Sequence, residues 1–189
     1  MKTFELKGSK RESTGKKATK ADRKESLVPC VLYGGDETVL FTITKESVRK
    51  LIYTPEVFLV SLSVEGKTYT AILKDTQFHP VSDALLHADF LQIFEDKPVV
   101  LEIPIILEGL AQGVRDGGKL SMNMRKLKVK GLYKDFPEKL VINIENLGLG
   151  KTIQVGNLNF DNLELMNNKD NVVAAVQLTR AARGLAAKA

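Results

Sequence analysis

Apolar and polar residues alternate in short runs along the first half of the chain. Apolar residues recur at every second position across residues 58–64, which is the period of a half-buried β-strand. Glu65-Gly66-Lys67 then forms a turn signal before a second run at 68–73, so the two runs predict a hairpin. Further strands are predicted at 28–33, 39–43 and 85–94.

The apolar period changes once in this half. Val48, Leu51 and Ile52 follow Thr44 at helical spacing, and threonine is a favoured helix N-cap. This predicts one short helix, which Pro55 helps to end. The first half is therefore predicted to be a small β-barrel or sandwich with one or two short helices.

A charged, proline-containing segment, Glu95-Asp96-Lys97-Pro98, is the candidate boundary between two domains. We predict a first domain over 1–94, a second mainly β domain over 95–178 and a basic, alanine-rich tail over 179–189. The second domain is expected to have strands at 99–107, 127–130, 140–144, 153–155 and 172–178. Glycines between 109 and 118 indicate a long connection. The predicted fold class is mainly β throughout.

Positive charge is concentrated near the amino terminus. Residues 1–24 contain nine Lys or Arg and three Asp or Glu, a net charge of +6, whereas the whole chain carries +5. Contact with an anionic polymer and a loose, solvated basic arm both fit this distribution, and charge alone does not separate them. The opening residues show no long apolar run, so we expect neither a signal peptide nor a membrane span. A single cysteine excludes an intramolecular disulfide, and we expect a cytoplasmic protein.

Signals for enzymes and metals are weak. Gly150-Lys151-Thr152 matches the end of a phosphate-binding loop, but position 145, where that loop needs glycine, holds Glu145. A glycine-rich turn between strands is the better interpretation. Cys30 lies in a strand-like apolar run, and only His79 and His87 are available as a base or as zinc ligands beside it. We therefore predict no catalytic residue, metal, cofactor or small-molecule substrate.

Residues 10–23 combine guanidinium, ammonium and hydroxyl groups around Gly15. Such groups donate hydrogen bonds to phosphate oxygens and ribose hydroxyls, and a glycine allows close approach of a nucleic-acid backbone. The segment runs on to Tyr33 beside a glycine turn, which adds an aromatic face and a hydroxyl. The chemistry of the first 35 residues thus favours RNA binding.

Three motifs follow one another in the first half: Arg11…Gly15-Lys16…Thr19-Lys20…Arg23…Val28-Pro29…Val31-Leu32-Tyr33-Gly34, then Asp75-Thr76-Gln77-Phe78-His79-Pro80, then Leu86-His87-Ala88-Asp89-Phe90. In this order they resemble the twenty-fifth protein family of the bacterial large ribosomal subunit, which includes general stress protein CTC. Residues 110–119 also resemble the Glu-Gly-x-x-x-Gly-Val-x-x-Gly-Gly segment of the longer family members.

The resemblance implies a β-barrel that binds the loop E region of 5S ribosomal RNA, followed by a second β domain, with neighbouring large-subunit RNA and ribosomal proteins as further partners. By matching position, it implies RNA contacts from Arg11, Lys16, Thr19, Lys20, Arg23, Tyr33, Gln77, His87 and Asp89. The four cations would meet phosphates or base edges. His87 and Asp89 are two apart on one predicted strand, so they would point to the same face and meet base edges or ribose hydroxyls.

Two positions depart from the family pattern. Ala21-Asp22 stands where the family often has a basic run, and Ser26 lies where glycine is common. An alternative in another functional class is a stress-related protein-interaction module whose RNA binding is incidental. Solvated surface roles for the basic segment and for the His87–Asp89 pair also remain open at this point.

Overall fold

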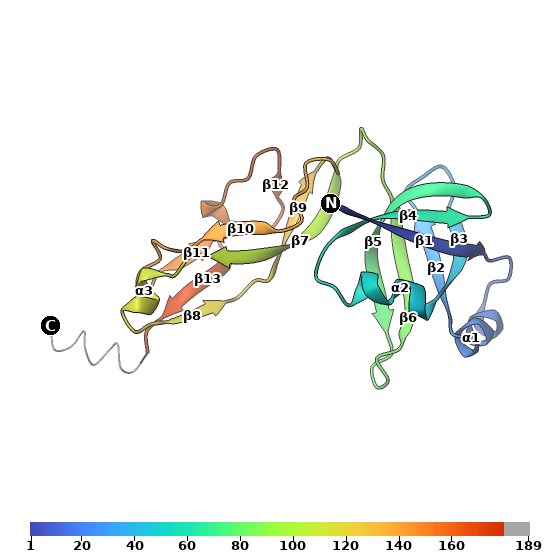
Figure 1. Ribbon diagram of the computed structural model, residues 1–189, viewed down its shortest axis with the longest axis horizontal. Coiled ribbons are helices and arrows are strands. Elements are labelled where there is room, and N and C mark those ends of the chain that lie inside the picture. Colours follow the sequence, from blue (N-terminus) through green and yellow to red (C-terminus); the bar gives the residue numbers. More distant parts are fainter. Residues whose placement is uncertain (180–189) are drawn as a thin grey trace. The chain divides into compact units, whose positions relative to one another are not determined.

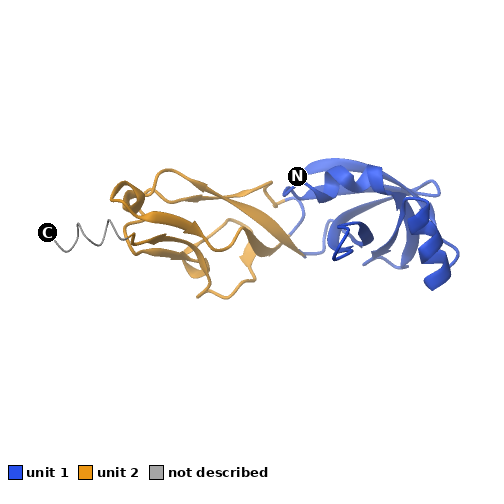
Figure 2. Cartoon of the chain, turned by 90° about the horizontal axis from the view of Figure 1, so that it is seen from below, with its two compact units in different colours: residues 1–99, 132–134 blue, residues 100–131, 135–189 orange. Residues whose placement is uncertain are grey.

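The computed structural model describes residues 1–179 (Figure 1). The chain divides into two compact units, one formed by residues 1–99 with 132–134 and the other by residues 100–131 with 135 onward (Figure 2). The predicted tail, apart from Thr179, lies outside the described residues.

The first unit is a closed barrel of six strands. The strands are β1 (Lys2–Lys10), β2 (Leu27–Tyr33), β3 (Val39–Thr44), β4 (Phe58–Val64), β5 (Lys67–Phe78) and β6 (Leu85–Gln92). They are hydrogen-bonded in the order β1-β3-β2-β6-β5-β4, and parallel pairing of β4 with β1 closes the ring. The predicted small β-barrel is confirmed, as is the antiparallel β4–β5 hairpin, in which Val64 faces Lys67.

Alternation along the strands fills the barrel with apolar side chains. Leu32, Phe41 and Phe90 are fully buried, and the rings of Phe41 and Phe90 pack with their centroids 5.6 Å apart. Because successive residues of a strand face opposite sides, the residues between these core positions lie on the outer surface of the barrel. The core therefore decides which polar residues are presented outside.

Two helices accompany the barrel, α1 (Lys16–Lys24) and α2 (Lys45–Ile52). Helix α2 confirms the predicted helix and buries Val48 and Leu51. Thr44 occupies the N-cap position, but no side-chain hydrogen bond is made there. Helix α1 and strand β1 were not predicted from apolar periodicity. Helix α1 has no buried residue, so its sequence contains no apolar stripe from which to predict it.

The second unit is also built mainly from strands, which confirms the predicted fold class. Its elements are β7 (Val99–Glu108), α3 (Gln112–Arg115), β8 (Lys119–Met122), β9 (Lys126–Gly131), β10 (Leu140–Asn143), β11 (Thr152–Gln154), the 3-10 turn η1 (Val155–Asn157), β12 (Glu164–Leu165) and β13 (Val172–Gln177). They form a sheet in the order β10-β7-β9-β12 and another in the order β11-β13-β8. Val155, predicted to end a strand, instead begins η1.

The glycine-rich connection after β7 packs against another glycine-rich turn, the one that contains Gly148 and Gly150. The backbone N–H of Gly113 donates to the carbonyl of Leu147 at 2.9 Å. A Cβ atom on Gly113 would lie 2.5 Å from backbone atoms of both Gly148 and Leu149. Gly113 is therefore required for close contact between α3 and the turn at Gly148 rather than for a bound ligand.

Gly113→Ala is expected to lower the free energy of unfolding of the second unit by about 1–3 kcal/mol, because the new methyl group would overlap backbone atoms that cannot rotate away. Gly148→Ala is the matched control, since the nearest atom to its Cβ would be Lys151 Cγ at 3.8 Å. We expect that variant to stay within about 0.5 kcal/mol of the parent. Urea unfolding of both variants tests the contact, and equal effects would contradict it.

Candidate nucleic-acid interface

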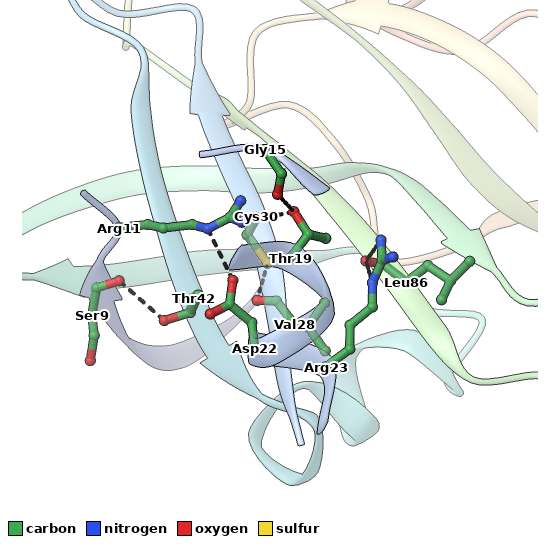
Figure 3. Close-up of polar contacts among 10 residues, drawn as sticks. All are labelled: Ser9, Arg11, Gly15, Thr19, Asp22, Arg23, Val28, Cys30, Thr42 and Leu86. Atoms are coloured by element: carbon green, nitrogen blue, oxygen red, sulfur yellow. Dashed lines mark hydrogen bonds and ion pairs between the residues drawn. The ribbon is translucent and has the colours of Figure 1, made fainter. Parts of the chain in front are cut away.

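Helix α1 is attached to the barrel through Arg11, which directly follows β1 (Figure 3). Arg11 Nε lies 3.0 Å from Asp22 Oδ2, and Arg11 Nη2 donates to Thr19 Oγ1 at 2.8 Å. The side chains of Arg11 and Asp22 are only 12% and 20% exposed. Arg11 therefore joins the end of β1 to one face of α1, and its guanidinium is largely occupied within the protein.

Thr19 uses its hydroxyl group inside this contact. Its Oγ1 donates to the carbonyl of Gly15 at 2.9 Å while it accepts the hydrogen bond from Arg11. Because its one donor is already engaged, Thr19 can offer an RNA ligand only a remaining oxygen lone pair. Its predicted RNA contact stays a prediction, and the visible role of the side chain is to fix the start of α1.

Arg23 attaches the far end of α1 to β6. Its Nε and Nη2 both donate to the carbonyl of Leu86, at 3.3 Å and 3.0 Å. Pairing of β6 with β2 begins only at Ala88, so Leu86 precedes the part of β6 that pairs with β2. The guanidinium of Arg23 is thereby held beside the residue that precedes His87 (Figure 3).

The outer face of β5 and β6 brings together residues from two separate motifs. His87 and Asp89 alternate with the buried residues Ala88 and Phe90, so both face outward. His87 Nδ1 lies 2.6 Å from Asp89 Oδ1, and because a carboxylate only accepts, the shared proton is on the imidazole side. On β5, Gln77 is directly opposite His87. Three predicted residues thus share one surface.

Tyr33 belongs to the same surface from the β2 side. In the parallel β2–β6 pair, Val31 is opposite Asp89 and Tyr33 is opposite Leu91. Partial burial raises the pKa of the Tyr33 hydroxyl, and the negative charges of Asp89 and Asp75 raise it further. The phenol therefore stays protonated well above neutral pH and remains a hydrogen-bond donor.

Positive charge on α1 lines an open groove of about 570 Å³. The lining residues are Lys16, Thr19, Lys20, Arg23 and Lys24. Sequence reasoning missed Lys24, although Lys16, Lys20 and Lys24 are four residues apart and so fall on one helical face. It also missed Asp75, which lies opposite Asp89 in the β5–β6 pair. Asp22 was interpreted only as a departure from the family pattern, whereas it is the ion-pair partner of Arg11.

Ser26 explains the glycine preference noted at this point in the family. It follows the C-cap of α1 and has a φ of 61°. This left-handed conformation favours glycine, since a side chain there is strained by about 1–2 kcal/mol. The turn that leads from α1 into β2 is thus built with a residue less favourable than glycine.

The surface has two chemically different parts. The lysines of α1 and the guanidinium of Arg23 are suited to phosphate oxygens. Next to them, Tyr33, Gln77, His87 and Asp89 present donors and acceptors, and a carboxylate there would repel a phosphate but accept from a ribose hydroxyl or a base amino group. The arrangement is suited to a folded RNA whose backbone and groove meet the protein together.

Alternative uses of the other candidate residues do not fit their positions. Cys30 is 2% exposed on the inner face of β2, its Sγ lies 3.5 Å from the carbonyl of Val28, and burial raises the pKa of its thiol. It therefore points away from the outward-facing His87. Thr152 begins strand β11 rather than the helix that a phosphate-binding loop requires. The imidazole of His79 caps its own turn by accepting from the backbone N–H groups of Val81 and Ser82.

Across residues 1–179, no group of three or more His, Cys, Asp or Glu side chains is arranged to hold a metal ion. Within the same residues, every helix is too short or too polar to cross a membrane.

Comparison with known protein families gives two matches that together cover most of the chain. Residues 6–90 match the ribosomal L25p family. Residues 98–180 match the C-terminal domain of ribosomal protein TL5. The interface residues on α1 and those on β5 and β6 lie within the first match.

Individual relatives match along nearly their whole length. The chain is 67% identical to large ribosomal subunit protein bL25 of Azobacteroides pseudotrichonymphae, over 97% of each chain. It is 60% identical to the protein of the same name from Parabacteroides distasonis, over 100% of both chains. The Bacteroides fragilis protein of that name is 56% identical over 100% of this chain and 99% of its own.

The thiol of Cys30 is expected to react with a thiol-specific reagent only when the barrel unfolds. Burial both blocks access and raises the pKa of the thiol, so little of the reactive thiolate forms in the folded protein. Labelling at pH 8 should be slow in buffer and complete in urea. Fast labelling of the folded chain would show that the β2 face carrying Cys30 is open to solvent.

Proposed function

The chain belongs to the ribosomal L25p family, and we propose that, as a structural protein of the large ribosomal subunit, it binds 5S ribosomal RNA through its barrel unit. Membership makes it a non-enzymatic component of the ribosome, in keeping with the expected cytoplasmic location. The 5S ribosomal RNA is the partner we propose for the first unit. Neighbouring large-subunit RNA and ribosomal proteins are the further proposed partners.

One observation carries the assignment of the RNA site. The two hydrogen bonds from Arg23 to the carbonyl of Leu86 hold the cationic helix directly beside the His87–Asp89 pair. Residues from the amino-terminal basic segment and from the motif at 86–90 are thereby parts of one continuous surface. A loose basic arm would not be fixed to a polar strand face in this way.

The proposed binding mode has an electrostatic and a geometric component. Lys16, Lys20 and Lys24 on α1 would neutralise RNA phosphates, releasing the cations that surround them. This part supplies attraction with little sequence preference. A helix fixes the spacing of the three ammonium groups along one face, whereas a loose arm would not hold them at a fixed spacing.

The strand face would supply register and specificity. His87 donates its Nδ1 proton to Asp89, which leaves Nε2 to face a ligand, and Asp89 keeps a second carboxylate oxygen for an RNA donor. Tyr33 adds a protonated hydroxyl and Gln77 an amide. Such groups distinguish bases and ribose hydroxyls in a wide, shallow groove, which is where RNA displays them.

His87→Ala and Arg23→Ala are each expected to weaken binding of the full chain to 5S ribosomal RNA by about 1–3 kcal/mol, because the first removes a proposed groove contact and the second removes a cation that also attaches α1 to β6. Lys50→Ala, an exposed cation on α2, is the matched control and should bind as the parent does. Filter binding or fluorescence titration at fixed salt measures the difference. Unchanged affinity in both variants, with an unaltered circular dichroism spectrum, would place the site elsewhere.

Lys20→Ala should reduce the dependence of affinity on salt. Each phosphate contact contributes about 0.7–0.9 to the slope of log affinity against log salt, so loss of one contact lowers the slope by that amount. His87→Ala should leave the slope unchanged, since it removes a polar contact rather than a phosphate contact.

Titration of the parent chain with 5S ribosomal RNA and with another folded RNA of equal length tests the protein-interaction alternative. That alternative predicts no preference for 5S ribosomal RNA.

A further inference from the structure

Helix α1 is poorly stabilised by its own sequence. It has nine residues, its N-cap Gly15 makes no side-chain cap hydrogen bond, and its first turn contains no acid. Isolated helices of this length are marginal in water. The pairs Lys16–Lys20 and Lys20–Lys24 also place like charges four residues apart, which destabilises a helix. The lysines suited to phosphate thus weaken the helix that displays them.

Asp22 is the only acid within α1 and is directed at Arg11 rather than at a neighbour on the helix. Positions 18 and 26, four residues to either side, hold Ala18 and Ser26, so neither offers it an ion pair at that spacing. Among the described residues, Arg11 Nε and Asp22 Oδ2 are solvent-shielded and lack a hydrogen-bond partner of good geometry, although they lie 3.0 Å apart. Each is the compensating charge for the other.

We propose that Asp22 is a positioning residue for RNA binding: its carboxylate holds Arg11 and α1 in the binding arrangement and so strengthens the RNA complex, despite its negative charge. This inference rests on the proposed function of the barrel unit. Counting charges alone predicts the opposite, because removing an acid from a phosphate-binding surface should strengthen attraction.

Two considerations decide between these opposing effects. The charge of Asp22 is already balanced by Arg11 at 3.0 Å, so the field it exerts on an approaching phosphate is small. Its removal, in contrast, leaves the nearly buried guanidinium without a counter-charge, which is costly for a shielded ion. The helix then loses one of its attachments to the barrel, and ordering it again on RNA lowers affinity.

The experiment compares two neutralising substitutions in the full chain. Asp22→Asn should bind 5S ribosomal RNA about 3- to 10-fold more weakly than the parent, as expected when a pre-organised segment is loosened. Glu25→Gln, which removes the same charge from an exposed position next to α1, should bind equally or slightly more tightly. Tighter binding by Asp22→Asn would overturn the proposal.

A double-mutant cycle shows whether Asp22 acts through Arg11. In the Arg11→Gln background, Asp22→Asn should cause little further loss, because the interaction that it breaks is already absent. Independent, additive losses would overturn the proposal, since they would mean that Asp22 does not work through the ion pair. Asp22→Glu, which keeps the carboxylate, should recover part of the affinity.

Hydrogen exchange without RNA separates this proposal from the proposed function. Asp22→Asn should speed amide exchange in α1 while strands β2 and β6 exchange at the parent rate. If the parent chain fails to bind 5S ribosomal RNA, the proposed function fails, and the exchange data alone judge the attachment of α1. Unchanged exchange in α1 would overturn the role of Asp22 whatever the RNA result.

Discussion

The parallel pairing of β2 with β6 is the constraint on which the interface depends. It sets Cys30 beside Ala88 and Leu32 beside Phe90, and the burial of these four residues fixes the register. A shift by one residue would turn the apolar set outward and the polar set into the core. The same pairing that excludes water from the barrel therefore decides that His87 and Asp89 face solvent, next to the strand that carries Tyr33.

Helix α1 illustrates how a charged segment is kept in shape without a buried apolar face. Its attachment is polar, through Arg11 to Thr19 and Asp22 and through Arg23 to the carbonyl of Leu86. The hydrogen bonds from Arg11 to Thr19 and from Arg23 to Leu86 have a charged donor, and such bonds are stronger than neutral ones and are directional. They hold the helix while leaving Lys16, Lys20 and Lys24 along the open groove. Around α1, Arg11 and Arg23 attach the helix to the barrel, and the lysines line the groove.

The second unit uses glycines for packing. Gly113 allows α3 to contact the backbone at Gly148 and Leu149, so a segment that resembles a phosphate-binding loop by composition packs against α3 instead. Glycine clusters often suggest ligands, because both a ligand and a neighbouring backbone need the space left by a missing Cβ. Here the structure supplies the neighbouring backbone, and the strand that begins at Thr152 removes the helix that nucleotide binding would need.

The sequence by itself determined the mainly β class, the β4–β5 hairpin and helix α2, because alternation, turn residues and apolar spacing are local signals. Its motifs also indicated the family and the nine candidate residues. Only the tertiary structure decided which of those residues share a surface, since Arg23 and Leu86 meet across a long stretch of chain that no local pattern encodes. It likewise revealed α1, whose stability comes from contacts with the barrel rather than from its own residues, and it gave Asp22 a partner. A charge can be counted from sequence, but whether it is compensated depends on which group the fold places 3.0 Å away.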